Sequence, residues 1–507
     1  MSSRSLTQVG AAVLGPADDL RANPRAPATR RGTALAGFIG AWALYFVILR
    51  LMPLPEGMSP AAKATLATVA WACVTWLTEA VPIALTGLQI PVLLLLGGAV
   101  PGFAAAAGGF VSEASFICLA SFLMAAVIQC VGLDRRITLA ILHRTRVTTV
   151  RGVIWALFLV DNLLAFIVPG ANTRGALLVP LVENINRLLG DTTAARAARK
   201  AIVIHSLVYG SMVSGLVVLT AGLQNLILVG LFRSQLGVEI SYGQWILLRW
   251  PYLGLAVITQ WWIRRHFGCV DMAIPGGATA IDRGYRELAP TSRREWRTIA
   301  ILVLTALGWA TEQLHHVPSH LVAVIGLSAL FLPGALSLDW TQVASRTIWG
   351  TYLTLCGAVS LSAAMASTGL GKWLADLVAP VAMGHSWPVV LLILYAAIHV
   401  LRLGMLSNVA SVAMLAPILL ALAPRLGLHP IAFTTLVVDA STFAFILPMQ
   451  ITVGTIAYGT GTFTIAEYAR VGWVTVLISA AYCILVMAPW YALMGVPLWD
   501  AAAPWPF

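Results

Sequence analysis

Long apolar runs separated by short polar segments dominate the pattern of this chain. A helix needs about 20 mostly apolar residues to cross the hydrocarbon core of a bilayer. The pattern predicts eleven such spans. Their approximate ranges are 34–52, 62–78, 82–100, 113–131, 201–232 and 244–263 in the first half, and 298–314, 319–333, 348–368, 429–460 and 470–495 in the second half.

Two further apolar stretches, about 152–185 and 389–424, are too long for one simple span and are interrupted by Gly, Pro and Asn. Irregular backbone at membrane depth is tolerated only where protein or a water-filled cavity surrounds it. We therefore interpret both stretches as re-entrant helical hairpins. The spans at 201–232 and 429–460 are also long and contain Gly interruptions, which predicts a broken helix in each.

The second half repeats motifs of the first half in the same order. The pairs are Trp76-Leu77-Thr78-Glu79 with Trp309-Ala310-Thr311-Glu312, Gly132-Leu133 with Gly369-Leu370, Ala171-Asn172-Thr173 with Ser407-Asn408-Val409, and Gly230 with Gly459, the last pair closing the two broken helices. The halves begin on opposite sides of the predicted membrane, so the repeat is inverted. Inverted repeats with paired discontinuous helices are typical of secondary transporters. The predicted fold class is an all-α polytopic membrane protein, with about eleven transmembrane helices plus two re-entrant hairpins in inverted repeats.

The composition favours a single membrane domain over several soluble domains. Of the 507 residues, 59% are hydrophobic and 10% are charged, whereas a soluble chain carries about 25% charged residues. We expect a disordered cytoplasmic tail at 1–33, a first membrane half at 34–263, a cytoplasmic linker at 264–297 and a second membrane half at 298–507.

The formal net charge of +11 follows the predicted topology. With a cytoplasmic N-terminus, the outer segments contain only four basic residues, which are Arg50, Lys63, Arg233 and Lys372. This asymmetry follows the positive-inside rule and suits contact with anionic lipid headgroups. The basic pI therefore needs no nucleic-acid partner. We expect a multi-pass protein of the bacterial inner (plasma) membrane with a periplasmic C-terminus.

Both predicted hairpins carry polar residues where the apolar run breaks. Asn172 and Thr173 follow Pro169-Gly170 in the first hairpin, and Ser407 and Asn408 interrupt the second. Ser and Asn at a helix start cap free backbone N–H groups, and helix N-termini favour anions. Side-chain amides add donors for a carboxylate and acceptors for a cation. The pattern predicts an anion site between the two tips. Simple helix capping within a packed bundle is the alternative.

Polar breaks also interrupt the two broken helices, at 219–225 and at 448–455. Unwound backbone there would release carbonyl oxygens that can coordinate a cation beside each tip. The alternative is a kinked helix whose Thr hydroxyls bond back to the backbone.

These motifs resemble the divalent anion/sodium symporter (DASS) family of the ion transporter superfamily. Trp76-Leu77-Thr78-Glu79-Ala80-Val81-Pro82 matches the family's Trp-x-Thr-Glu-Ala-x-Pro stretch. The segments 171–173 and 407–409 each keep two residues of its Ser-Asn-Thr tips. Of its Gly-Thr-Pro-Pro-Asn-like unwound loops, 221–225 keeps only Asn225 and 450–454 keeps no residue in place. The resemblance extends in order over about 60–495.

The resemblance implies transport of di- or tricarboxylates, or of sulfate, by an elevator-like movement of the hairpins and broken helices against a fixed scaffold. It also implies a homodimer and two sodium ions, one beside each tip, with no other cofactor and no metal site. Together with the polar breaks it indicates as substrate-binding residues Asn172, Thr173, Arg174, Ser407, Asn408, Val409 and Thr452. The indicated cation-binding residues are Asn172, Gly222, Asn225, Asn408, Thr452 and Gly454.

Arg174 lies two residues past Asn172, where the family usually has a small residue. An arginine at the bilayer midplane costs about 2.5–3.5 kcal/mol on insertion scales unless it is partnered. It could hold a substrate carboxylate bidentately, or stand in for a sodium ion, which would suit an exchanger. Alternatively it pairs with Asp161 or Glu183, or it reaches the cytoplasmic interface. Arg402, just before the second tip, raises the same question.

The sequence thus predicts a secondary active transporter of small organic anions, with sodium symport as one form of coupling. A sodium-independent anion exchanger, a transporter of sulfate or arsenite, and a sodium–proton antiporter of the same superfamily stay open. The antiporter would need intramembrane acids near the tips, for which Asp161 and Asp439 are the candidates. The chain contains no HExxH, GxSxG or paired membrane His motif, so we expect no enzyme.

Overall fold

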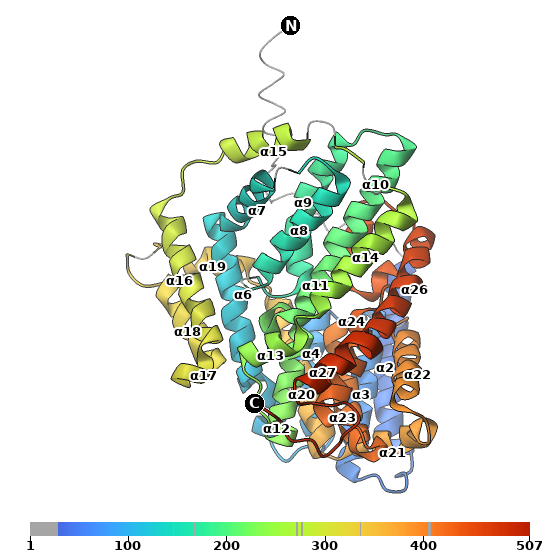
Figure 1. The fold of residues 1–507 in the computed structure, drawn as a ribbon. Coiled ribbons are helices and arrows are strands. Elements are labelled where there is room, and N and C mark those ends of the chain that lie inside the picture. The colour runs from blue at the N-terminus through green and yellow to red at the C-terminus, as the bar shows by residue number, and fades with distance from the viewer. Residues whose placement is uncertain are drawn as a thin grey trace.

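The computed structural model describes residues 29–145, 147–166, 168–269, 272–274, 277–334, 336–403 and 407–507. These residues are helical and contain no β-strand, and one isolated bridge joins Thr149 to Ala273. The all-α polytopic fold predicted from the sequence is confirmed (Figure 1). Of the predicted tail, residues 1–28 lie outside the described residues.

The helices before the first hairpin follow the predicted spans closely. They are α2 (Thr29–Phe46) with η2 (Val47–Leu51), α3 (Pro60–Thr78), α4 (Ile83–Leu96), α5 (Phe103–Ala106), η3 (Gly108–Val111), α6 (Glu113–Val131) and α7 (Leu133–Arg144). The predicted end of the second span is confirmed, because α3 stops at Thr78 and Glu79 adopts a left-handed φ of 48°.

The first hairpin and the first broken helix come next. The hairpin is α8 (Val150–Ala165) with α9 (Ala171–Leu188), and the broken helix is α10 (Thr193–Val203), η4 (Ile204–Tyr209), α11 (Gly210–Val217), η5 (Leu219–Ala221) and α12 (Leu223–Leu236), followed by α13 (Tyr242–Arg249) and α14 (Tyr252–Phe267). The broken helix begins before the predicted residue 201, because Thr192 caps its first turn by accepting from the Ala195 N–H. The prediction that Gly230 closes this helix is wrong. It lies inside α12, which ends where Gly237 turns left-handed with a φ of 67°.

The second half has the same sequence of elements. After α15 (Gly277–Arg286) in the linker come α16 (Arg293–Ala310), α17 (Glu312–His315), α18 (Ser319–Leu330), α19 (Trp340–Arg346), α20 (Trp349–Ser367) and α21 (Leu370–Ala382). The second hairpin is α22 (Trp387–Arg402) with α23 (Asn408–Leu422) and η6 (Ala423–Leu426). The second broken helix is α24 (Pro430–Thr442), η7 (Pro448–Gln450) and α25 (Thr452–Gly459), followed by α26 (Ile465–Tyr482), η8 (Cys483–Met487) and α27 (Ala488–Leu493).

The repeat is visible in backbone conformation as well as in the order of the helices. A left-handed glycine lies between α6 and α7 and another between α20 and α21, namely Gly132 with φ 77° and Gly369 with φ 80°. The hairpin helices α9 and α23 contain Pro180 and Pro417, at the same spacing as the two glycines. The correspondence between the halves therefore continues into the hairpins.

Five helices in the described part of the chain are long and apolar enough to cross a membrane, and the number rises to seven if each of two bent helix pairs is one span. One of these pairs joins α21 to α22 and bends by 118°. The count of eleven spans stays a prediction, because several predicted spans are shorter or interrupted helices.

Helix α20 packs closely against α4 and also contacts the second hairpin. α4 packs along α20, and α20 also packs against α23. A Cβ added at Gly87 would overlap the backbone of α20, and one at Gly357 would overlap the backbone of α4. Small residues of this kind allow helices to meet backbone to backbone. In Figure 1, α7, α10 and α15 lie at the upper end of the molecule and α12, α17 and α21 at the lower end.

Candidate functional site

The two hairpins and the two broken helices pack on one another reciprocally. Within each half, the first part of the broken helix lies against the hairpin of that half, as α11 does against α9 and α24 against α23. The second part crosses to the other half, since α25 packs against α9 and α12 packs against α23. Elements of both halves therefore surround each hairpin tip.

Individual contacts show how close this crossing is. Asn408 at the second tip places its Nδ2 3.9 Å from Met212 Sδ on α11 of the first half. Gly175 on α9 faces α25 of the second half, and a Cβ added there would overlap the side chain of Val453. The tips are thus tied to the opposite broken helices, as a shared site requires.

The first tip is not capped as the sequence suggested. The residue before α9 is Gly170, whose φ of 79° favours glycine, and no side chain caps the helix. The Gly170 N–H donates to the Ala221 carbonyl in the first break, at 3.1 Å. Asn172 and Thr173 lie in the first turn, with Asn172 exposed and Thr173 partly exposed. The expected capping by Asn172 is therefore wrong, and its side chain remains available to a ligand.

Arg174 is fully buried in the first turn of α9 and donates only to protein atoms. Its Nε donates to Asp161 Oδ1 at 3.1 Å, so the pairing with Asp161 is the alternative that the structure contains. A guanidinium has five N–H donors, and all five are used here. The other four donate to the carbonyl oxygens of Val168, Ala221 and Ser211 and to Ser214 Oγ, at 3.0–3.2 Å. No N–H of Arg174 is left to bind a substrate carboxylate in this arrangement.

Asp161 on α8 completes a neutral buried network with Arg174. The carboxylate is fully buried and accepts from Ser211 Oγ at 3.0 Å and from Ser214 Oγ. Residues three apart share one face of a helix, so this serine pair is a signal that could have been recognised in the sequence. The network joins both hairpin helices to α11 and compensates the charge of Arg174.

The second tip follows the predicted capping pattern. Ser407 is the N-cap of α23, and its Oγ accepts from the Ala410 N–H at 3.2 Å. Asn408 is partly exposed, whereas the side chain of Val409 is buried. The predicted tip residues 404–406 lie outside the described residues. A polar side chain therefore caps the second hairpin helix, where the first has glycine.

Arg402 ends α22 and is fully buried beside this tip. It donates to Asn408 Oδ1 at 2.6 Å, to Ser411 Oγ at 3.1 Å and to the Gln450 carbonyl in the second break. Among the residues that the structure describes, its Nε has no hydrogen-bond partner, and no carboxylate lies within ion-pair distance. The second tip thus contains a buried positive charge that no acidic residue in this part of the chain compensates.

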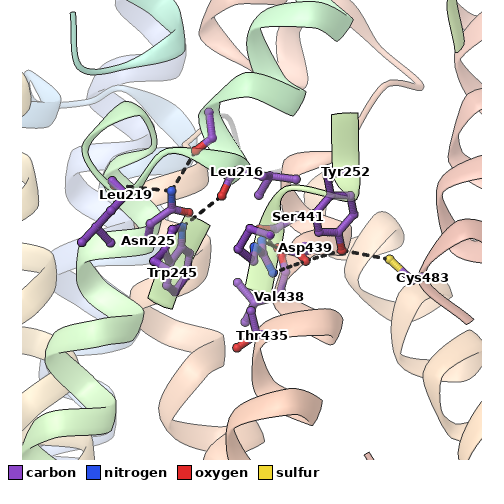
Figure 2. Close-up of polar contacts among 12 residues, drawn as sticks. Leu216, Leu219, Asn225, Trp245, Tyr252, Thr435, Val438, Asp439, Ser441 and Cys483 are labelled. Atoms are coloured by element: carbon purple, nitrogen blue, oxygen red, sulfur yellow. Dashed lines mark hydrogen bonds and ion pairs between the residues drawn. The ribbon is translucent and has the colours of Figure 1, made fainter. Parts of the chain in front are cut away.

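In the first break, the side chain of Asn225 forms hydrogen bonds with backbone carbonyl groups that the unwound helix leaves free. Asn225 is buried, and its Nδ2 donates to the carbonyls of Gly215 and Val218 at 2.8 and 3.2 Å. Figure 2 shows the same amide turned toward Leu219. Gly222 adopts an extended conformation, and an added Cβ would overlap the Gly215 carbonyl. Of the polar atoms here, Asn225 Oδ1 has no partner among the described residues.

The second break is more open. Thr452, the first residue of α25, is exposed, so its hydroxyl is available to a ligand. Gly454 is buried, and an added Cβ would overlap the Pro448 carbonyl. The Gln450 side chain folds back and accepts from the Leu447 N–H at 2.8 Å. Gly454 therefore serves close packing, whereas the side chain of Thr452 is not covered by other residues.

Arginine side chains take the carbonyl oxygens at both breaks. Ala221 accepts from Arg174 in the first break, and Gln450 accepts from Arg402 in the second. Unwound carbonyls of this kind are the ligands of a coupling sodium ion. The cation that stands at each break is thus a tethered guanidinium. No group of three or more His, Cys, Asp or Glu side chains in the described ranges could hold a metal ion.

A second buried ion pair joins the two halves, and no sequence pattern indicated its basic partner, Arg249. Arg249 on α13 donates to both carboxylate oxygens of Asp439 on α24, at 2.5 and 2.8 Å. Tyr252 Oη donates to the same carboxylate at 2.5 Å (Figure 2). Both acids considered for an antiporter, Asp161 and Asp439, are therefore held by arginine. This pairing counts against the antiporter alternative.

A cavity of about 880 Å³ reaches the first break. Leu219 in the break forms part of its wall, together with the charged side chains of Glu113 and Arg233, which form an ion pair. Residues of α12, α17 and α18 also line the cavity, so it lies between the first break and these helices.

Comparisons with known proteins agree over most of the chain. The sequence profile of a family described as the sodium:sulfate symporter transmembrane region matches residues 36–496. A protein named only as a membrane protein, from Cupriavidus necator, is 30% identical over 479 residues, which cover 90% of this chain and 93% of that protein. Two sodium-dependent dicarboxylate transporters named SdcS are also similar. That of Staphylococcus saprophyticus is 26% identical and covers 88% of this chain and 89% of its own. That of Staphylococcus aureus is 25% identical and covers 90% of each.

Among solved structures, the YdaH transporter of Alcanivorax borkumensis is similar in fold. It aligns with a TM-score of 0.54 and 16% sequence identity over 85% of this chain and 99% of that chain. At this identity the likeness concerns the fold alone.

Proposed function

The chain belongs to the family of the sodium:sulfate symporter transmembrane region, and from this premise we propose that it is a secondary active transporter of small organic anions. Family membership places it among membrane transporters and not among enzymes. Di- and tricarboxylates are the substrate class that we propose. Two relatives that match most of the chain are named sodium-dependent dicarboxylate transporters, which supports this choice.

The observation that carries the proposal is the reciprocal packing of the hairpins and the broken helices. It brings the N-terminal ends of α9 and α23 next to both halves of the molecule. Helix N-termini present free N–H groups and the positive end of the helix dipole, which favour an anion. The proposed substrate contacts are Asn172, Thr173, Ser407, Asn408, Thr452 and the backbone N–H of Val409. Arg174 is not included among these contacts, because all five of its N–H groups donate to protein atoms.

The proposed movement is elevator-like. The hairpins, the broken helices, α14 and α26 would move together with the substrate. The scaffold would consist of α3, α4, α6, α16, α18 and α20, which pack against one another. The glycine contact between α4 and α20 suits a rigid scaffold, because it leaves no space for the two helices to shift.

We propose two alternative forms of coupling between anion transport and its driving force. In the first, sodium binds beside each tip, with ligands from Asn172, Gly222, Asn225, Asn408, Thr452 and Gly454, as in a symporter of this family. In the second, the protein exchanges anions without sodium. The second is favoured by a specific observation, since Arg174 and Arg402 already donate to the carbonyls of the two breaks.

We further propose a bacterial inner-membrane location with a cytoplasmic N-terminus and a periplasmic C-terminus. The Arg-rich segments α7, α10 and α15 lie at one end of the molecule (Figure 1), which supports this orientation under the positive-inside rule. The homodimer implied by the family resemblance stays a prediction.

The test is uptake of labelled succinate, citrate and sulfate into proteoliposomes that contain the purified full chain, with and without sodium. We expect saturable uptake of a carboxylate, and we expect Asn172→Ala and Asn408→Ala to lower it about tenfold or more, equivalent to about 1.4 kcal/mol. The matched control is Asn162→Ala, because the Asn162 amide donates to the Phe158 carbonyl of its own helix. Uptake of none of the carboxylates by correctly folded protein would contradict the proposal.

A further inference from the structure

The two buried arginines beside the tips differ in their charge balance, and this difference bears on how transport is coupled. We infer that Arg402 is the fixed counter-charge of the transported anion and that it makes the protein an obligate anion exchanger. The inference rests on the proposed function, because it needs an anion that binds at the tips. It goes further by assigning the coupling to one residue.

The contacts of Arg402 are all with neutral groups. Of its five N–H donors, three have partners in the described part of the chain, namely Asn408 Oδ1, Ser411 Oγ and the Gln450 carbonyl. These dipoles solvate the guanidinium but do not cancel its charge. Nε has no partner within the same residues, although the side chain is 0% exposed. A buried charge is normally paired with an opposite charge, so the missing partner is supplied from outside the protein.

The hydrogen bond from Arg402 also fixes which end of the Asn408 side-chain amide is left for a ligand. The amide oxygen of Asn408 accepts from Arg402 at 2.6 Å, so the NH₂ group is the part left for a ligand. In the structure this NH₂ group contacts only a weak acceptor, Met212 Sδ at 3.9 Å, which an incoming carboxylate replaces at little cost. The oxygen that a sodium ion would need already accepts from Arg402, whose positive charge repels a cation at this point. The second tip is therefore built to donate to an anion and not to coordinate a cation.

At the first tip, by contrast, the positive charge of the buried arginine is compensated by a carboxylate of the protein. Arg174 has the carboxylate of Asp161 at 3.1 Å and uses every donor within the protein. When Asn172 is paired with Asn408, the position corresponding to Arg174 in the second half is Ala410, so the second hairpin helix has no arginine there. The charge of Arg174 is thus compensated within the protein, whereas that of Arg402 is compensated only when an anion binds.

Exchange follows from this difference. An empty transport unit would carry the uncompensated charge of Arg402 through the low-dielectric part of the membrane, which is unfavourable. When a dicarboxylate binds, one carboxylate offsets the charge of Arg402 and the other faces the free N–H groups at the N-terminal ends of α9 and α23, so the unit can move. The loaded unit therefore crosses, whereas the empty unit stays on one side until another anion binds. No sodium ion takes part in this cycle.

The experiment compares exchange with net uptake in sodium-free buffer. Proteoliposomes containing the full chain are either preloaded with unlabelled succinate or left without internal anion, and uptake of labelled succinate is followed. For the wild type we expect uptake in preloaded vesicles to exceed uptake in empty vesicles by about tenfold or more, and added sodium to change neither rate. For Arg402→Gln we expect the ratio to fall toward one. Arg402→Lys keeps a positive charge, so the ratio stays high although both rates fall.

A second variant keeps the inference testable if Arg402→Gln does not fold. Ser411→Asp retains Arg402 but places a carboxylate beside it, which copies the first tip, and it should also bring the ratio toward one. Arg196→Gln, at an exposed arginine far outside the tips, is the matched control and leaves the ratio unchanged.

A binding measurement separates the two proposals. Succinate should raise the thermal unfolding temperature of the purified wild type and of Arg402→Lys, and should raise that of Arg402→Gln by a smaller amount. Binding of succinate together with sodium-dependent net uptake, or with a ratio near one in the wild type, would overturn the inference and leave the proposed function standing. If succinate, citrate and sulfate neither bind nor are transported by folded protein, both proposals fail.

Discussion

The two hairpin tips occupy corresponding places in the repeat, and each lies beside a fully buried arginine. The two arginines differ in how their positive charge is compensated. At the first tip, Arg174 is paired with Asp161 and bonded through all five donors. At the second tip, Arg402 has neutral partners and no acidic one among the described residues. The charge of the first arginine is thus compensated within the protein, and the charge of the second is not compensated by any acidic residue that the structure describes.

The difference has a physical origin in where each arginine lies on its helix. Arg174 is in the first turn of α9, at the positive end of the helix dipole, where a cation is disfavoured. A nearby carboxylate is therefore needed to hold it there. Arg402 is the last residue of α22, where the helix dipole itself favours a cation. It can remain without a carboxylate partner, and its charge stays available.

The largest expected effect comes from breaking the pair at the first tip. Asp161→Ala leaves Arg174 buried without a counter-charge, which should destabilise the fold by about 3–5 kcal/mol. The thermal unfolding temperature and the monodisperse fraction of the purified protein in detergent measure the loss. At the second tip, Ser411→Ala removes only a neutral partner of Arg402 and should cost about 1.5–3 kcal/mol.

The matched control for this experiment replaces both members of the pair. Asp161→Leu combined with Arg174→Met leaves no buried charge, and should recover most of the stability lost in Asp161→Ala. If Asp161→Ala were as stable as Ser411→Ala, the two tips would not differ in the way described.

A smaller effect, similar at both sites, is expected at the helix breaks. Gly222→Ala and Gly454→Ala each place a methyl group against a backbone carbonyl, and each should cost about 1–3 kcal/mol. Gly459→Ala is the control, because no atom lies within 4 Å of an added Cβ there, and its cost should stay within about 0.5 kcal/mol. Unfolding temperatures again report the change. A tolerated alanine at only one break would show that the two breaks are not packed alike.

The smallest expected effect concerns the caps. Ser407→Ala removes the side-chain cap of α23 and should cost about 1 kcal/mol of stability. Asn172→Ala should change stability by less than about 0.5 kcal/mol, because Asn172 is exposed and Gly170 begins α9. Both substitutions should still reduce uptake. Equal losses of stability would mean that Asn172 contributes to the helix start after all.

Much of the fold could be predicted because the signals are local. A long apolar run predicts a span, and Gly, Pro and Asn within such a run predict a break, so both hairpins and the second broken helix lie close to their predicted ranges, whereas the first broken helix begins at Thr193, before the predicted residue 201. The capping of the second tip by Ser407 was also predictable from residue type. The capping of the first tip was not, because a glycine with positive φ replaced the side-chain cap.

The ion pairs depend on helices that are distant in the chain. Arg249 and Asp439 are 190 residues apart, and no pattern in either helix shows that they face each other. Likewise, Asp161 was one of several possible partners for Arg174, and only the packing of α8, α9 and α11 selects it, together with Ser211 and Ser214.

The sequence by itself determined that this chain lies in a membrane, that it folds as two related helical halves, and where each half is interrupted. Hydrophobicity and helix-breaking residues act over a few turns, so they can be recognised without the fold. Only the tertiary structure decided which buried arginine is neutralised and which is not. The reason is that the energy of a buried charge depends on the distance to its partner, and that distance is set by helices brought together from both halves.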